Sequence, residues 1–262
     1  MAPRNPAPER ISVEDALREA LSRNHDLLAE RARVPAADAD VRTAGLRPNP
    51  VTSVSADHLP LAGTQFTEEN GGGPPEYTWR TDYLWELGGK RDRRLDVAGH
   101  QRGVTRMEGA DRERHLVLEV RDAFVDLLLA QKTLELAEAS AAALGRVADL
   151  STARVRSGDL AEVELLRTRV ARVNLENEVR LKDLARRAAQ QRLAYLLGRP
   201  ASRSGLEASG EFRESPAGAA PLDRLEASAA EQRPDLLALS ADLSRAEADL
   251  RSLPGLGPDY TV

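Results

Sequence analysis

The sequence predicts a mainly α-helical protein with a small antiparallel β-hairpin and a long coiled-coil helical hairpin. All 15 prolines of the 262-residue chain lie at or before Pro75 or at or after Pro200. The 124 residues between these two prolines are rich in Ala, Leu, Glu and Arg, which favours long uninterrupted helices. Aromatic residues make up only 3% of the chain, yet four of them fall between Tyr77 and Trp85. This cluster lies at the start of the proline-free region, in a segment whose odd and even positions carry different kinds of residue.

Composition and motifs exclude several kinds of protein. The net charge of −5 gives no support to nucleic-acid binding, and the chain has no cysteine for disulfides, thiol chemistry or sulfur-ligated metals. No apolar run approaches the ~18–20 residues that a membrane-spanning helix requires. The four histidines share no ligand spacing, and we find no nucleophile elbow, zinc-protease motif or phosphate loop. We therefore predict no enzyme activity, no cofactor and no metal site.

The N-terminal region is expected to hold a disordered leader, residues 1–10, followed by helices over residues 11–46. Three prolines fall within the first eight residues. No positively charged stretch followed by an apolar one is visible, so the sequence shows no signal peptide. Either the protein is cytosolic, or the start of this sequence is not that of the natural precursor.

Residues 47–87 are expected to form a β-hairpin. The segment Tyr77–Leu87 alternates over eleven residues, as a strand with two different faces does. One face carries aromatic rings, those of Tyr77, Trp79, Tyr83 and Trp85. The other face carries charges, those of Arg80, Asp82 and Glu86. A weaker strand, Val51–His58, precedes this segment, and a Gly/Pro-rich loop joins the two.

The aromatic face of this hairpin admits two interpretations. It could cover a core, or it could face hydrocarbon while the charged face lines a water-filled lumen. Eleven residues match the ~9–11 of a membrane-crossing barrel strand. The next element is a helix with apolar rows of its own, which leaves no nearby core. A lone hairpin has open edges that lipid does not tolerate, so a hairpin in a membrane would have to be completed by other copies.

Residues 88–198 are expected to form the long helical hairpin, with arms of roughly 100 and 60 Å at ~1.5 Å per residue. The first arm has a heptad seam at Leu116, Val120, Ala123, Leu127, Ala130, Leu134, Ala137, Ala141, Leu144 and Ala148. A second apolar row requires neighbours on another side and consists of Leu118, Val125, Leu129, Leu136, Ala143, Val147 and Leu150. In the turn, Gly158 is expected to end the first helix and Asp159 to cap the second. The second arm has one apolar row, with Asn177 on it, at Leu160, Val163, Leu166, Val170, Val173, Leu181, Leu184 and Ala188.

The chain contains an internal repeat. Asp26–Arg42 aligns with Asp235–Arg251 at an offset of 209, with nine of seventeen positions identical. We expect residues 199–221 to be a linker and residues 222–262 to begin a second repeat. The sequence would then stop where the second hairpin should start, and we expect such a fragment alone neither to trimerise correctly nor to conduct.

The order of these segments resembles that of the TolC-like outer-membrane efflux proteins, notably the heavy-metal and multidrug branch. The resemblance is carried by AGLRPNP, the aromatic strand, GGKR (88–91), the RVRSGDL turn, YLLGRP (195–200) and RPDL (233–236). It implies a homotrimer in which each protomer gives four strands to an outer-membrane barrel and its helices form a periplasmic tunnel. It also implies a passive exit duct for metal ions or drugs, driven by an inner-membrane pump and contacted by a periplasmic adaptor protein.

The resemblance also suggests roles for particular residues. The turn would be the periplasmic tip that docks the adaptor, with Arg156, Ser157, Gly158, Asp159 and Leu160 in contact, although it could equally be a plain capping turn. A basic cluster at the start of the first long helix, Lys90, Arg91, Arg93 and Arg94, is disfavoured by the helix dipole. It could lie where barrel and tunnel meet, or it could be a solvated face. A periplasmic adaptor and a soluble coiled-coil protein remain the alternative interpretations of the chain.

Overall fold

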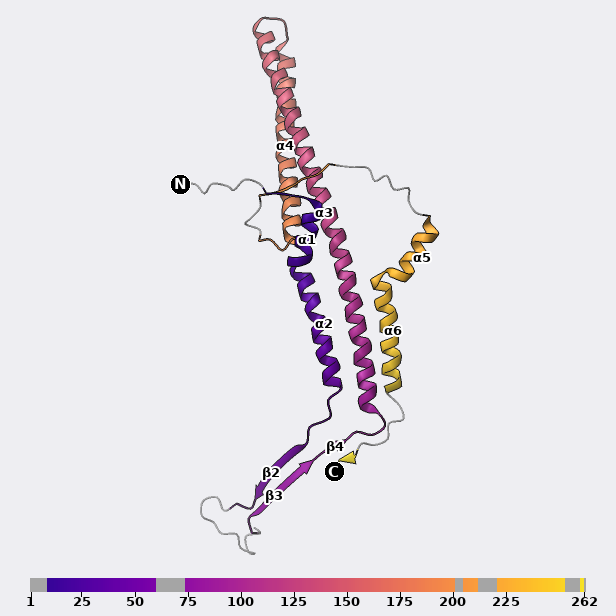
Figure 1. The fold of residues 1–262 in the computed structure, drawn as a ribbon. Coiled ribbons are helices and arrows are strands. Elements are labelled where there is room, and N and C mark those ends of the chain that lie inside the picture. The colour runs from indigo at the N-terminus through magenta and orange to yellow at the C-terminus, as the bar shows by residue number, and fades with distance from the viewer. Residues whose placement is uncertain (1–8, 60–73, 201–204, 212–220, 253–259, 262) are drawn as a thin grey trace. The chain divides into compact units, whose positions relative to one another are not determined.

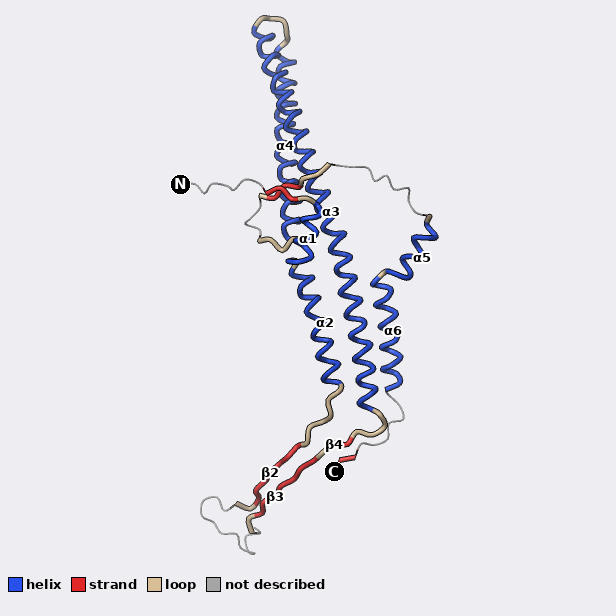
Figure 2. The backbone as a smooth tube through the Cα atoms, viewed as in Figure 1, coloured by secondary structure: helices blue, strands red, loops and turns tan. Residues whose placement is uncertain are grey.

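The computed structural model of the chain describes residues 9–59, 74–200, 205–211, 221–252 and 260–261 (Figure 1). Helices dominate, and the strands are short (Figure 2). In chain order the elements are β1 (Glu9–Ile11), α1 (Val13–Arg23), α2 (His25–Ala44), β2 (Val51–Asp57), β3 (Glu76–Asp82), β4 (Leu84–Trp85), α3 (Lys90–Arg156), α4 (Glu162–Leu196), β5 (Leu206–Ala208), α5 (Leu222–Gln232), α6 (Pro234–Ser252) and β6 (Tyr260–Thr261). Within the described part, no helix is both long and apolar enough to cross a membrane.

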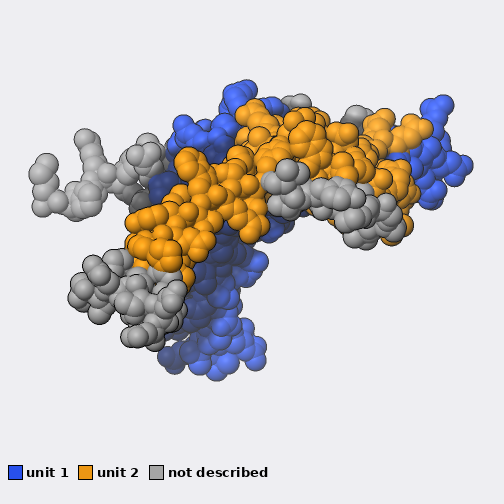
Figure 3. Space-filling view, turned by 90° about the horizontal axis from the view of Figure 1, so that it is seen from below, with its two compact units in different colours: residues 1–32, 109–230 blue, residues 33–108, 231–262 orange. Residues whose placement is uncertain are grey.

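The chain divides into two compact units, which Figure 3 colours separately. The first consists of residues 1–32 and 109–230, and the second of residues 33–108 and 231–262. Both α2 and α3 pass from one unit into the other.

The first unit holds the hydrophobic core. Leu116, Val120 and Leu127 of α3 are fully buried, and they cluster with buried residues of α1, α4 and β5. The strands β1 and β5 pair in parallel, Glu9 opposite Leu206. Residues 9 and 10 therefore belong to a strand rather than to the disordered leader that we expected. The partner strand falls within the expected linker.

The long helical hairpin of this unit has the predicted turn. Gly158 has a φ of +84°, its N–H donates to the Val155 carbonyl, and the Asp159 N–H donates to the Arg154 carbonyl. These are the two bonds of a Schellman C-cap, which needs a residue that tolerates a left-handed backbone. The prediction that Asp159 caps the second helix is wrong. Ala161 is the N-cap of α4, and the Asp159 carboxylate accepts a hydrogen bond from Ser157 Oγ at 2.8 Å instead.

The predicted seam of α3 is confirmed, because all ten of its residues are buried or half-buried. The second apolar row of α3 is exposed throughout, and Leu136 and Leu150 are among its most exposed members. The apolar row of α4 is exposed as well, from Val163 to Leu184, and so is Asn177. The residues of α4 that are shielded instead follow another heptad row, which includes Leu165, Thr168, Leu175, Val179, Lys182, Arg186, Ala189 and Leu193. Each arm therefore presents an uncovered apolar row in the described part of the chain.

In the second unit, charges join α2 to α3. Arg33 lies 3.5 Å from Glu108, and Asp38 lies 3.6 Å from both Arg102 and Arg106. Apolar burial is sparse here, since Ala37 and Val104 are the buried hydrophobic residues of this stretch. The packing of α2 on α3 in this unit therefore depends on ion pairs and small residues.

The repeat is visible in the element bounds. α1 and α5 both span 11 residues, and the starts of α1 and α5, and of α2 and α6, are each separated by 209 residues. β6 begins 209 residues after β2. The sequence repeat thus corresponds to a repeated helix–helix–strand unit, whose segment 253–259 lies outside the described residues.

Candidate functional site

The β2–β3 hairpin is antiparallel, and its register separates two kinds of side chain. Trp79 pairs with Val54, Tyr77 with Ala56 and Thr81 with Thr52. Residues directly opposite one another in an antiparallel pair project to the same face. One face is therefore aromatic and aliphatic and also holds the threonine pair, whose hydroxyls lie 3.2 Å apart.

The opposite face of the hairpin is polar. Arg80 pairs with Ser53 and Thr78 with Ser55, and Arg80 also forms an ion pair of 2.8 Å with Asp82. The register thus gives both strands the same apolar side and the same polar side, although their sequences are unrelated.

Neither face of this hairpin is covered within the described residues. All seven residues of β2 are exposed, and so are all but the last of β3. Trp79 is 79% exposed and Tyr77 is 73% exposed. Exposure of large aromatic rings is costly in water, at about 25 cal/mol per Å² of apolar surface. Within the described residues the rings of Tyr77 and Trp79 are not packed against a core, which was the alternative interpretation of the aromatic face.

The predicted continuous strand Tyr77–Leu87 is interrupted at Tyr83. β3 pairs with β2, whereas β4 pairs antiparallel with β6, with Leu84 opposite Thr261 and Trp85 opposite Tyr260. At Tyr83 the chain changes its strand partner from β2 to β6, and the strand is interrupted because of this change. Tyr83 and Trp85 still contact each other edge to face, with ring centroids 6.0 Å apart.

Glu86 does not share the strand face of Arg80 and Asp82. It follows the end of β4, its side chain is only 13% exposed, and its carboxylate forms an ion pair with Arg94 of α3. The charged set expected on one strand face is therefore divided between the hairpin and the strand–helix junction.

Two arginines of the basic cluster at the start of α3 donate to carbonyls at the ends of other helices. Arg91 Nε donates to the Gly45 carbonyl at 2.6 Å, just beyond the end of α2. Arg93 donates to the Arg251 carbonyl at 3.3 Å, in the last turn of α6. Carbonyls at a helix C-terminus lack intrahelical partners and carry partial negative charge. The favourable contacts of Arg91 and Arg93 with the ends of α2 and α6 thus compensate for their unfavourable position at the N-terminus of α3. The helix α6 is the counterpart of α2 in the repeat.

The turn residues Arg156–Leu160 lie at the junction of α3 and α4, and all but Leu160 are exposed. Ser157 Oγ lies 2.8 Å from the Asp159 carboxylate and 3.0 Å from the Arg154 carbonyl, and either can accept its hydrogen bond. The turn is thus internally hydrogen-bonded and presents its outer surface to solvent.

The sequence profile of the family described as "Outer membrane efflux protein" matches residues 16–199. The chain belongs to this family. A curated relative, the cobalt-zinc-cadmium resistance protein CzcC of Cupriavidus metallidurans, is 27% identical over 238 residues. That alignment covers 91% of this chain and 54% of the relative, so the chain spans about half the length of that protein.

Solved outer-membrane channels share the fold of this efflux-family chain. The CmeC channel of Campylobacter jejuni superposes with a TM-score of 0.76 at 14% identity, covering 92% of this chain and 52% of that one. The open-state MtrE channel of Neisseria gonorrhoeae gives 0.65 at 16% identity, covering 92% and 54%. The predicted fold class, long helical hairpin with short barrel-type strands, is thereby confirmed.

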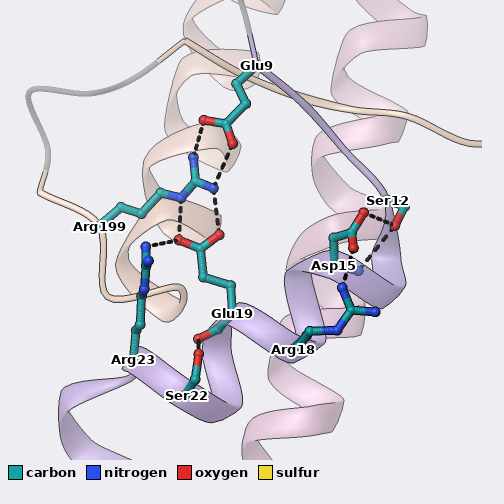
Figure 4. A network of polar contacts seen from close by, with 8 residues as sticks. All are labelled: Glu9, Ser12, Asp15, Arg18, Glu19, Ser22, Arg23 and Arg199. Atoms are coloured by element: carbon teal, nitrogen blue, oxygen red, sulfur yellow. Dashed lines mark hydrogen bonds and ion pairs between the residues drawn. The ribbon is translucent and has the colours of Figure 1, made fainter.

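One polar cluster of the efflux-family chain was not predicted. Arg199, in the YLLGRP segment, donates to Glu19 at 2.8 and 2.5 Å and to Glu9 at 2.7 and 3.1 Å (Figure 4). The side chains of Arg199 and Glu19 are only 15% and 14% exposed. The hydrogen bonds that Arg199 donates to Glu19, and then those to Glu9, raise the pKa of Arg199 above its ordinary value.

The glycine before Arg199 positions the arginine for these ion pairs with Glu19 and Glu9. Gly198 has a φ of +70°, and the Arg199 N–H donates to the Ala194 carbonyl at 2.9 Å in a second Schellman cap. The LGRP motif thus ends α4 and fastens it to α1 and β1. A Gly-Arg pair after a long apolar helix was the available signal, but its two acidic partners lie 180 and 190 residues away in the sequence.

Proposed function

We propose that this chain forms part of the outer-membrane duct of a tripartite efflux system. The duct would be a passive, water-filled exit for metal ions or drugs, with energy supplied by an inner-membrane pump. The observation that carries this proposal is the β2–β3 hairpin, which has one apolar aromatic face and one polar, charged face, neither covered by the part of the chain that the structure describes. Family membership favours this function over a periplasmic adaptor or a soluble coiled-coil protein. No residue constellation of an enzyme supports a catalytic role.

In the proposed duct the aromatic face, with Tyr77 and Trp79, contacts lipid, and Arg80 and Asp82 face the lumen. Tyr83 and Trp85 would continue the lipid-facing belt at the end of the strand. β6 supports this placement, because this strand of the second repeat pairs antiparallel with β4 at the end of the aromatic segment, as successive repeats in a barrel would.

The exposed apolar rows of α3 and α4 support a homotrimer. A helix with two apolar rows needs two neighbours, and only one row of each arm is shielded here. We infer that the second row packs against helices of neighbouring subunits and of the second repeat, which together would wall a periplasmic tunnel.

The turn Arg156–Leu160 is proposed as the docking site of the periplasmic adaptor. Its exposed side chains stand at the end of the helical hairpin, and its backbone is fixed by the Schellman bonds. A photo-crosslinking residue at Ser157 should capture the adaptor in cells. The same residue at Arg146, exposed on α3 away from the turn, should not. Equal capture at both positions would contradict docking at the turn.

The lipid-facing assignment is tested by a pair of lysine substitutions on adjacent residues of β3. Trp79→Lys places a charge on the apolar face, where a cation at the membrane midplane costs about 2–4 kcal/mol. Thr78→Lys places the same charge on the polar face. When the substitutions are made in a complete efflux duct that contains this chain, we expect W79K to lose assembly into the outer-membrane fraction and resistance to the exported substrate, and T78K to retain both. If both variants behave alike, the aromatic face does not contact lipid and the proposed duct is wrong.

A further inference from the structure

A cavity of about 230 Å³ lies in the second unit, where β4 runs into the first turn of α3. We call it the junction cavity. Its cationic lining comes from Arg47, Lys90 and Arg91, and its aromatic lining from Tyr83 and Trp85. The proposed duct gives no role to this cavity.

The charge around the junction cavity is positive. Two carboxylates also line it, those of Glu86 and Asp92. Glu86 is matched by Arg94, which lies outside the lining. Asp92 is 81% exposed and lies 3.7 Å from Arg91, so water screens its charge strongly. Counted together with Arg94, the lining carries four cations and two carboxylates, and this net positive charge attracts anions.

The cavity also has hydrogen-bond donors to offer. A guanidinium carries five N–H donors in a planar fork, and Arg91 directs Nε to the Gly45 carbonyl. Arg47 also lines the cavity, and it is exposed on the segment that follows α2. Arginine forks match the oxygens of a phosphate group in geometry as well as in charge. The N-terminus of α3 at Lys90 adds partial positive charge on the same side.

The aromatic rings beside the cations indicate where in the cell such an anion would be bound. Trp85 is 56% exposed beside the cations, and its indole pairs with Tyr83 edge to face. Tryptophan and tyrosine beside lysine or arginine are typical of the boundary between hydrocarbon and water. The exposed apolar face of the β2–β3 hairpin precedes this boundary in the chain, and the polar helix α3 follows it.

We propose that the junction cavity binds the phosphate headgroup of an anionic phospholipid in the inner leaflet of the outer membrane. This inference rests on the proposed function for the position of the hairpin in the membrane. The cations hold the phosphate, and Trp85 and Tyr83 lie along the glycerol and the first acyl carbons. The bound lipid would fix the depth of the barrel at its junction with the helices.

The test uses the two tryptophans of the chain, Trp79 and Trp85. In a Trp79→Phe background, Trp85 is the sole tryptophan and reports on the cavity. The purified protein is titrated with dihexanoyl phosphatidylglycerol below its micelle concentration, with dihexanoyl phosphatidylcholine and with inorganic phosphate. We expect a saturable change in Trp85 emission with phosphatidylglycerol and binding at least tenfold weaker for the other two.

Charge variants assign the signal to the cavity. Arg47→Gln should weaken phosphatidylglycerol binding roughly tenfold or more, the effect of losing one hydrogen bond to a charged group. Arg47→Lys keeps the cation but loses the planar fork, so it should weaken binding less than Arg47→Gln does. Lys132→Gln removes an exposed cation of α3 that does not line the cavity and should leave binding unchanged. Circular dichroism spectra confirm that the variants are folded.

Three outcomes overturn the proposal: no saturable signal, equal affinity for inorganic phosphate, or equal weakening by Arg47→Gln and Lys132→Gln. The proposed duct is judged separately by the W79K and T78K pair. Normal membrane assembly without a Trp85 signal would overturn the lipid site alone. A saturable signal that depends on Arg47, in a protein that stays out of the outer membrane, would overturn the duct and keep an anionic-lipid site.

Discussion

Replacing Gly198 by alanine should destabilise the first unit far more than the same change at Gly158. Both glycines have a positive φ, +70° and +84°, and both end a long helix in a Schellman cap. A left-handed backbone costs an L-residue about 1–2 kcal/mol, and this cost applies to both sites. Nothing lies within 4 Å of a Cβ at Gly158.

The surroundings of Gly198 add a second cost. A Cβ there would overlap the Arg23 carbonyl oxygen and lie 3.0 Å from the Arg23 carbonyl carbon. Both atoms belong to the backbone at the end of α1, so no rotamer change relieves the overlap. Overpacking of this kind costs about 1–3 kcal/mol, which gives about 2–5 kcal/mol in all for Gly198→Ala. The shift would also move Arg199 away from Glu19.

Urea unfolding of the two variants, followed by far-ultraviolet circular dichroism, measures this difference. We expect the free energy of unfolding to fall by about 1–2 kcal/mol for G158A and by about 2–5 kcal/mol for G198A. Equal losses in the two variants would refute the close approach of α4 to α1 that the reasoning assumes.

Three further predictions concern polar groups. Arg199→Met should cost about 1.5–3 kcal/mol of unfolding free energy, because it removes charge-assisted hydrogen bonds to the largely buried Glu19 carboxylate, which keeps its 3.2 Å contact with Arg23. Arg18→Met, at an exposed pair with Asp15, should cost at most ~1 kcal/mol, and equal losses in the two variants would contradict a structural role of the Arg199 ion pairs. Asn24→Ala should cost about 1–3 kcal/mol, since the buried amide accepts from the Leu27 N–H and donates to the Leu196 carbonyl; a change within error in thermal unfolding would count against this bridge. The pKa of Asp183 is lowered from its ordinary 3.8 by hydrogen bonds from Arg186 and Arg187. Its contribution to stability is therefore fully present above that value and is lost as the pH falls through the lower pKa of the folded state. The wild-type protein should lose more unfolding free energy on acidification than Asp183→Asn does. Parallel plots of unfolding free energy against pH for the two proteins would contradict this.

Several features could be predicted because they depend on neighbours in the sequence. The proline-free stretch gives α3 its 67 residues, and a glycine at 158 gives the turn. The repeat at an offset of 209 predicts α5 and α6 from α1 and α2. Alternation in the aromatic segment predicts which residues share a face, and the observed register of β2 with β3 keeps that division.

Other features could not be predicted, because distant segments decide them. The inward row of α4 contains Thr168, Lys182 and Arg186, so hydrophobicity alone selects the outer row, Val163 to Leu184, as the seam. The break at Tyr83 depends on β6, which is distant in the sequence. Tyr260 of β6 lies 175 residues after its pairing partner Trp85. The partners of Arg199 and the capping roles of Arg91 and Arg93 likewise come from remote backbone and side chains.

By itself, the sequence determined the local conformations of this chain. These are the positions of the helices, the points where they end, and which alternate residues of each strand form its apolar face. Periodicity and backbone preference suffice for these, since they act over a few residues. The tertiary structure alone decided which of two apolar rows is covered, which strand pairs with which edge, and which charges meet. Those choices depend on what the rest of the chain supplies as a neighbour, and no local pattern contains that information.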